Sequence, residues 1–179
     1  MTIPRLILEA IRDLIWQFLP ASWFKTNSDK PAFAFLVHPR NIADVLKKYP
    51  HTRFLSALTV QWLLRYFWPV IVSEVEGLRS QKTGEPIRGW IITITLTASQ
   101  LMQDRAHAVR RLKRAVKLAR VRGATVLGLG ALNASVTYRG RELNDLLREY
   151  QMGVTTGVGY TDYNISDLAI LLITKFKLE

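Results

Sequence analysis

The residues best suited to hold a phosphate group lie in a glycine-containing stretch. Gly128-Leu129-Gly130 follows an apolar run typical of a strand, as the dinucleotide-binding fingerprint requires, because glycine lets backbone amides approach a pyrophosphate at a helix start. Asn133 stands at the third position of that fingerprint, where glycine or alanine belongs. No acidic residue closes a second strand about twenty positions further on. A tight strand-to-loop turn therefore explains this pattern better than a nucleotide site does.

A second stretch combines hydroxyl groups with glycine. Thr155 and Thr156 precede Gly157, and Thr161 and Asp162 follow. Two hydroxyls on a flexible backbone can bind a polar ligand, and the same residues can cap the helix that we expect after them. Capping is the commoner role of such residues. Their chemistry alone therefore favours helix capping over the binding of a polar ligand.

His38 lies before Pro39 at the end of the apolar run 32–37. Catalytic and binding groups of α/β folds often follow such strands, so His38 is a candidate for contacting a substrate. A lone histidine is usually structural, and a proton donor would need a partner and a substrate within hydrogen-bond reach.

A strongly cationic segment runs from residue 104 to residue 122. It contains eight arginine or lysine side chains against a single acid, Asp104. Small and apolar residues recur at helical spacing between them, so we expect one face of this helix to be buried and the other to be cationic. Such a charge run, in a chain of net charge +11, favours an anionic partner. The expected partner-binding residues are Arg110, Arg111, Arg114 and Lys117.

The composition excludes several kinds of site. The chain has no cysteine, which excludes disulfides, thiolate metal ligands and a cysteine nucleophile. The three histidines show no i, i+3 or i, i+4 spacing, so no metal site is expected. No apolar run reaches the roughly 18 residues of a membrane span, and charged residues interrupt any signal-peptide pattern. We expect a cytoplasmic protein.

Strands and helices alternate in the expected fold. Strands are predicted at 32–37, 70–78, 90–96 and 124–130, where apolar and β-branched residues are enriched. The turn-rich stretch 80–89 makes the second and third of these a β-hairpin. Helices are predicted at 41–48, 54–67, 99–121, 141–150 and 163–176. We expect the first two to pack inside the domain. Residues 128–140 are predicted to be a glycine-rich loop. The fold class is therefore α/β, a largely parallel sheet flanked by helices on both faces, over residues 31–179.

Residues 1–30 are predicted to be an amphipathic N-terminal helix, 3–19, and a connector. The apolar face of the helix consists of Ile7, Leu8, Ile11, Leu14, Ile15 and Phe18. Such a helix packs on its own domain or on a partner chain, or else lies in a membrane interface. The polar face carries charges of both signs, which favours packing on protein.

Four stretches in this order resemble the N-terminal part of the fatty-aldehyde-forming, long-chain acyl-carrier-protein reductases and their Rossmann-containing relatives. They are FAFLVHPRNIADV, KTGEPIRGWIITI, ARVRGATVLGLGAL and VTTGVGYT. In that family, an acyl group held on acyl carrier protein passes to an enzyme cysteine and is reduced by NADPH to a fatty aldehyde. The family's Rossmann domain and cysteine lie downstream of the matched region.

The resemblance implies an α/β substrate-side domain that faces the acyl group and forms one wall of a nucleotide cleft. It places Thr155, Thr156 and Gly157 toward the cofactor, and His38, Gly130 and Asn133 toward the substrate. NADPH would bind only with a partner or a downstream Rossmann domain. No catalytic residue is expected in this chain, since it has no cysteine.

Two partners remain open. The basic helix suits acidic acyl carrier protein, because opposite charges speed docking. Alternatively, the chain is a non-enzymatic peripheral membrane or lipid-associated protein, with helix 3–19 as its anchor on an anionic surface. Nucleic acid is not the expected partner, because the cationic segment contains no aromatic platform and the chain no recognisable binding motif.

Overall fold

A computed structural model of the chain describes residues 3–20, 23 and 32–156. Its strands are β1 (Ala32–Val37), β2 (Val70–Val75), β3 (Arg88–Thr93), β4 (Val126–Leu129) and β5 (Gly153–Thr155). Its α-helices are α1 (Ile3–Phe18), α2 (Ile42–Lys48), α3 (Ala57–Tyr66), α4 (Ala98–Gln103), α5 (Arg105–Val121), α6 (Ala131–Val136) and α7 (Asn144–Glu149). Two 3-10 helices, η2 (Pro50–Phe54) and η3 (Arg141–Leu143), precede α3 and α7.

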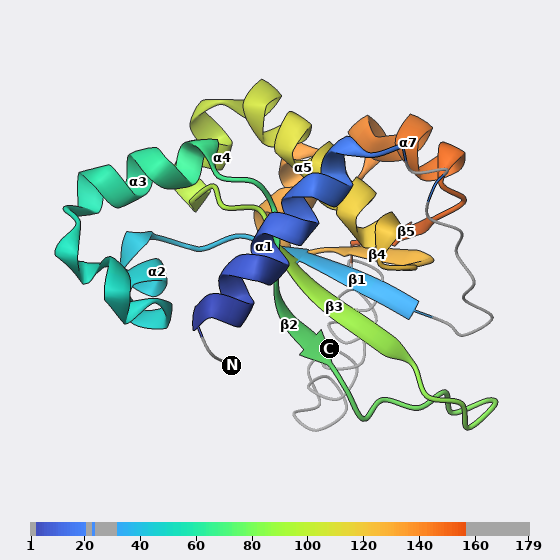
Figure 1. Ribbon diagram of the computed structural model, residues 1–179. Helices are drawn as coiled ribbons and strands as arrows, with labels where there is room; N and C mark the ends of the chain where they lie inside the picture. Colours follow the sequence, from blue (N-terminus) through green and yellow to red (C-terminus); the bar gives the residue numbers. More distant parts are fainter. Residues whose placement is uncertain (1–2, 21–22, 24–31, 157–179) are drawn as a thin grey trace, which may run out of the picture.

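The strands form one sheet in the order β2-β3-β1-β4-β5. β1 pairs in parallel with both β3 and β4, and β4 pairs in parallel with β5. β2 and β3 are antiparallel neighbours, joined by the exposed turn that the sequence predicts. The α/β class, the largely parallel sheet and the hairpin are therefore confirmed (Figure 1).

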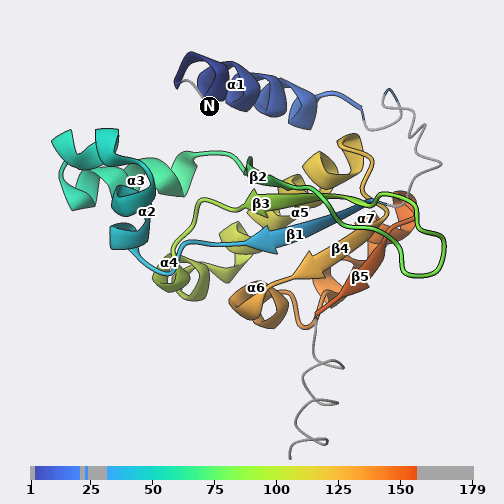
Figure 2. The ribbon, with the colours of Figure 1, turned by 90° about the horizontal axis from the view of Figure 1, so that it is seen from below.

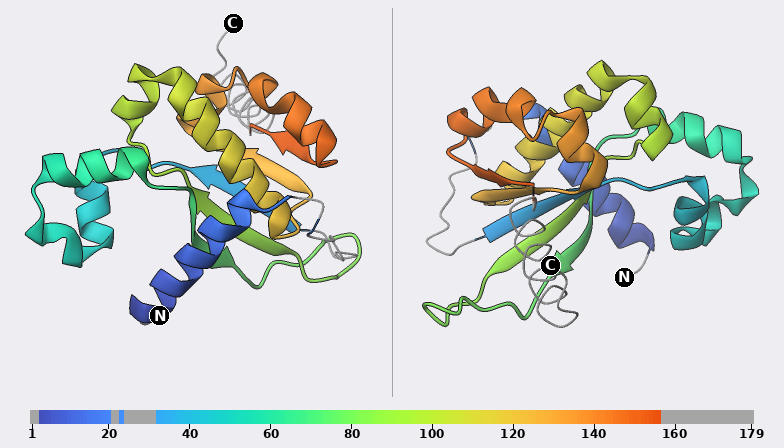
Figure 3. Two further views of the ribbon diagram at one scale, coloured as in Figure 1. Left: turned by 45° about the horizontal axis from the view of Figure 1, so that its top comes forward. Right: turned by 180° about the vertical axis from the view of Figure 1, so that it is seen from behind.

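The core lies between the sheet and α5. Leu36, Ile92 and Leu127 point from three neighbouring strands toward Leu112 and Val116 of α5, and all five side chains are fully buried. Bringing such side chains out of water stabilises the fold by about 1.5–3 kcal/mol each. α5 packs over the strands on this face of the sheet (Figure 3).

The opposite face of the sheet is crossed by none of the described helices (Figure 2). It carries Phe33 and Phe35, whose rings lie directly over Gly89 and Gly128 of the neighbouring strands. Phe35 is exposed. Within the described part of the chain, helices therefore cover one face of the sheet, whereas the sequence predicts helices on both. The predicted helix 163–176 lies outside the described residues.

The N-terminal helix packs on the domain through its polar side. Asp13 is 2% exposed and Gln17 is also buried, and Gln17 Nε2 donates a hydrogen bond to the Pro69 carbonyl, 3.0 Å away, just before β2. The apolar residues Leu8 and Phe18 are each 68% exposed. The helix itself is confirmed, but Leu8 and Phe18 do not pack on the described part of this chain, and packing of the apolar face on a partner chain stays a prediction.

Two further expectations about helices were wrong. The predicted helix 99–121 is divided at Asp104, which ends α4 and caps α5 by accepting a hydrogen bond from the His107 amide. The predicted glycine-rich loop contains α6, for which Gly130 is the N-cap residue. Gly123, at φ +82°, ends the α5 segment as expected.

Candidate functional site

Several of the predicted site residues meet at the carboxyl edge of the parallel strands. The Leu36 carbonyl, near the end of β1, accepts hydrogen bonds from the Gly130 amide at 3.1 Å and from Asn133 Nδ2 at 2.9 Å. His38 follows two residues after Leu36 and is half-buried. Gly130 and Asn133 therefore join the turn after β4 to the end of β1, and His38 leaves β1 at the same edge, which is where ligands bind in open α/β sheets.

The His38 ring has a definite local partner. Its Nδ1 lies 3.1 Å from the Pro39 carbonyl, which can only accept, so Nδ1 carries the proton in this hydrogen bond. In the neutral ring, Nε2 is then an acceptor, and it becomes a donor when the ring is protonated. Of the two nitrogens, Nε2 is the one that can exchange a proton with a substrate.

The turn after β4 does not fit a dinucleotide pyrophosphate. Asn133 is fully buried and its amide holds β1, whereas the fingerprint needs a small residue there. The Phe35 ring covers Gly128, and a Cβ at Gly130 would meet the Leu36 carbonyl at 3.0 Å. Since backbone and ring already fill the space beside both glycines, they serve close packing of β4 on β1. NADPH would have to be held mainly by residues outside this turn.

The threonines of the second candidate stretch lie at the same edge. Thr155 ends β5 in register with Gly128 of β4, so it is near the start of the turn that leads to Gly130. Thr155 is exposed and Thr156 is half-buried. Gly157 lies outside the described residues. The structure thus places Thr155 and Thr156 beside the candidate substrate residues without giving them a ligand role.

An exposed apolar surface lies beyond this edge, on α3 and the residues before it. Leu58, Trp62 and Tyr66 recur every four residues on one side of α3, and Leu58 and Trp62 are 79% and 61% exposed. The Trp62 and Tyr66 rings are 5.2 Å apart. We call this the α3 apolar surface; it also includes Phe54, Leu55 and Leu63. The expected inside packing of this helix was therefore wrong.

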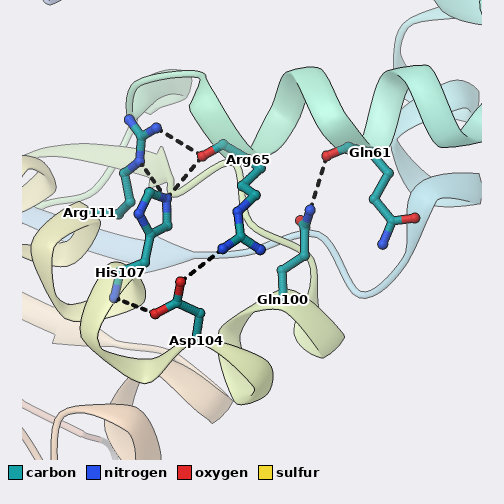
Figure 4. Close-up of polar contacts among 6 residues, drawn as sticks. All are labelled: Gln61, Arg65, Gln100, Asp104, His107 and Arg111. Atoms are coloured by element: carbon teal, nitrogen blue, oxygen red, sulfur yellow. Dashed lines mark hydrogen bonds and ion pairs between the residues drawn. The ribbon is translucent and has the colours of Figure 1, made fainter.

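A polar network holds the C-terminal end of α3 against α4 and α5 (Figure 4). Arg65 on α3 forms an ion pair of 2.9 Å with Asp104. The Arg65 carbonyl also accepts a hydrogen bond from Arg111, at 2.9 Å, and lies 3.0 Å from His107 Nε2. Gln100 adds a hydrogen bond to the Gln61 carbonyl. These contacts fix the direction in which the α3 apolar surface faces.

Asp104 carries the negative charge of this network. The His107 amide donates to its carboxylate and lowers the pKa of Asp104 below the usual 3.8, and the positive charge of Arg65 lowers it further. The carboxylate is therefore ionised at neutral pH, when it both caps α5 and holds Arg65.

The cationic face of α5 does not include every residue expected on it. Arg110 and Arg114 are exposed, as is Lys113 between them. Arg111 is only 5% exposed and belongs to the network under α3, and burial lowers the pKa of its guanidinium. Lys117 is half-buried, and burial lowers its pKa while Glu149 opposes that shift. Arg110 and Arg114 are thus the best placed of the four to meet a partner.

Sequence reasoning did not predict the polar network beneath the α3 apolar surface, and it favoured core packing over an acyl-lining role for Trp62 and Leu63. A signal was present: Leu58, Trp62 and Tyr66 share helical spacing, while Gln61 and Arg65 lie on another side of α3. Asp104 and Arg111, the partners of Arg65, lie 39 and 46 positions further along the chain. Helical periodicity is a local signal, so it could not identify these partners.

The described residues offer neither a metal site nor a membrane-spanning helix. No group of three or more histidine, aspartate or glutamate side chains is placed there to hold a metal ion. None of the helices in that part of the chain has the length and apolar character needed to cross a bilayer.

Comparison with known proteins gives no family for this chain. No protein-family model matches it, and no curated protein matches it significantly.

Proposed function

We propose that this chain is the substrate-side domain of an NADPH-dependent, acyl-carrier-protein reductase-like oxidoreductase. In this role it binds the acyl group carried by an acidic acyl carrier protein and presents it to a Rossmann-type domain that supplies the nucleotide site and the cysteine. The observation that carries the proposal is the α3 apolar surface, whose Leu58, Trp62 and Tyr66 side chains are exposed in a row along the helix.

The α3 apolar surface suits a fatty chain. Leu58, Trp62 and Tyr66 form a continuous row along one side of α3, and each leaves most of its side chain in water. An exposed apolar row of this length lowers the solubility of a protein unless a ligand or a partner covers it. A saturated acyl chain laid along the row would bury apolar area on both sides, and the Trp62 ring would supply the largest single contact.

Carrier protein and acyl chain would be bound by adjacent surfaces. Arg110 is close enough to Asp104 for its charge to lower the carboxyl pKa, and Asp104 is paired with Arg65, which precedes Tyr66. The cationic face of α5 therefore starts where the α3 apolar surface ends. An acidic carrier docked on Arg110 and Arg114 would place its acyl group near Tyr66.

The chemistry would be shared between this chain and another domain. NADPH supplies hydride when bound, and the glycines of the turn after β4 pack against the Phe35 ring and the Leu36 carbonyl, which favours a nucleotide site on another domain. In this proposal His38 would exchange a proton through Nε2 at the edge where the acyl carbonyl would arrive. This division predicts substrate binding, without turnover, for the isolated chain.

The experiment is a calorimetric titration of the wild type and two variants with palmitoyl-loaded acyl carrier protein. Leu58→Ser/Trp62→Ser removes the apolar row, whereas Leu78→Ser changes an exposed leucine in the hairpin turn. The first variant should bind at least about tenfold more weakly, since each lost apolar contact costs about 1 kcal/mol. Equal affinity of both variants and the wild type would exclude α3 as the acyl surface.

A further inference from the structure

The packing of α1 leaves an apolar stripe in water. Leu8, Ile11, Ile15 and Phe18 lie on one side of this helix, at spacings of three and four residues, and all four are exposed. An amphipathic helix at the surface of a globular domain normally turns its apolar side toward the core. We call these four residues the α1 apolar stripe.

The polar side of α1 is fastened to the domain at three points. Arg122, at the end of α5, forms an ion pair with the buried Asp13 carboxylate, and Arg12 approaches the same carboxylate at 3.5 Å. Gln17 bonds to the Pro69 carbonyl. The Trp16 ring lies near the Arg12 and Arg122 guanidinium groups, at 4.9 Å and 5.0 Å. The contacts of Asp13, Trp16 and Gln17 with Arg122 and Pro69 would be lost if the helix turned over, so they hold the apolar stripe outward, whereas the contacts of Arg12 lie within α1.

Positively charged side chains of α5 accompany the α1 apolar stripe. The Arg114 guanidinium lies 5.8 Å from the Phe18 ring, and Arg110 and Lys113 are exposed on the same helix. Asp13 faces inward and is already paired with Arg122. The outer surface at this end of α1 therefore combines apolar side chains with the positive charge of Arg114, for which no ion pair is found among the described residues, and this is the pattern of helices that lie in the interface of anionic membranes.

We propose that α1 docks the protein on an anionic lipid surface, with the α1 apolar stripe inserted among the lipids and Arg114 and Lys113 at the phosphates. This inference uses a different helix and a different apolar surface from the acyl-binding role, and of the residues assigned to that role it shares Arg114 alone. A second copy of the chain is a poorer occupant: in a two-fold dimer across the stripe, each Arg114 would face the cations of the partner.

The test is co-sedimentation of the full chain with vesicles of phosphatidylcholine alone and of phosphatidylcholine with phosphatidylglycerol. The wild type should bind the anionic vesicles and lose most binding when salt is raised or phosphatidylglycerol is omitted. Ile15→Ser/Phe18→Ser should weaken binding at least about tenfold, since two apolar insertions are lost. Leu78→Ser, which changes an exposed leucine in the hairpin turn, is the control and should bind as the wild type does.

Three results would overturn the proposal. One is the absence of wild-type binding to anionic vesicles, and another is unchanged binding of Ile15→Ser/Phe18→Ser. The third is a concentration-dependent dimer, seen by analytical ultracentrifugation, that Ile15→Ser/Phe18→Ser abolishes, because a second copy would then cover the stripe.

Discussion

Asp13 on α1 and Arg122 at the end of α5 form an ion pair that joins residues 109 positions apart. Asp13 is buried and Arg122 nearly so, so removing the carboxylate would leave a cation poorly solvated. Asp13→Asn should therefore lower the free energy of opening α1 by about 2 kcal/mol. Hydrogen exchange of the α1 amides should become roughly thirtyfold faster.

The matched control for this substitution is Glu74→Gln, which breaks the exposed ion pair between Glu74 and Arg88. Exposed pairs contribute less than about 1 kcal/mol, so exchange in β2 and β3 should change little. Unaltered α1 exchange in Asp13→Asn would mean that this ion pair does not fasten the helix.

Gly128→Ala should destabilise the sheet, because the new methyl group would collide with the Phe35 ring. We expect a loss of about 1–3 kcal/mol in urea unfolding. Phe35→Ala in the same chain should relieve the collision, so the double variant should lose less than the sum of the two single effects. Simple additivity would show that the ring does not lie across Gly128.

Stability should depend on the charge of Asp104 at acid pH. The pKa of Asp104 is lowered in the folded chain by the His107 amide and then by Arg65, so its ionised form stabilises the fold above the unfolded pKa, usually 3.8. This contribution disappears as pH falls through the folded pKa. Asp104→Asn should be less stable than the wild type at pH 7, and the difference should shrink as the pH falls below about 4. Urea unfolding across pH measures it, and a difference that is constant with pH would contradict it.

The rate of carrier association should depend on the cationic face of α5. Arg110→Gln/Arg114→Gln should slow binding of acyl carrier protein at low salt, and the effect should fade as salt rises. Arg79→Gln/Lys82→Gln removes the same charge from the hairpin turn and is the control. Stopped-flow rates that fall equally in both variants would show that only net charge matters.

Local patterns predicted most of the scaffold. The apolar runs of β1 and β4 and the turn chemistry between β2 and β3 identify the strands, because each signal lies within a few residues. Asn41, the first residue of the predicted helix 41–48, caps α2 by accepting a hydrogen bond from the Asp44 amide at 3.0 Å. The break at Asp104 was also readable locally: Thr97 and Gln100 form a capping box that starts a short helix, and Asp104 can cap the next one.

The outward-facing surfaces were not predictable from the sequence in the same way. Periodicity separates the two sides of α1, but the choice of the side that packs depends on Arg122, far along the chain. For α3, the abundance of apolar residues suggested burial, whereas Arg65, Asp104 and His107 hold the helix in a position where its apolar side meets water. Both choices rest on long-range polar contacts, which residue type alone does not reveal.

Acyl-dependent binding of carrier protein tests the proposed function most directly. The measurement is calorimetric titration of the wild-type chain with acyl carrier protein, with and without a palmitoyl group, at low and physiological salt. The account predicts saturable binding to both forms, at least about tenfold tighter for the acylated carrier because the chain buries apolar area on α3. Equal affinity for the two forms, or no binding at either salt, would contradict it.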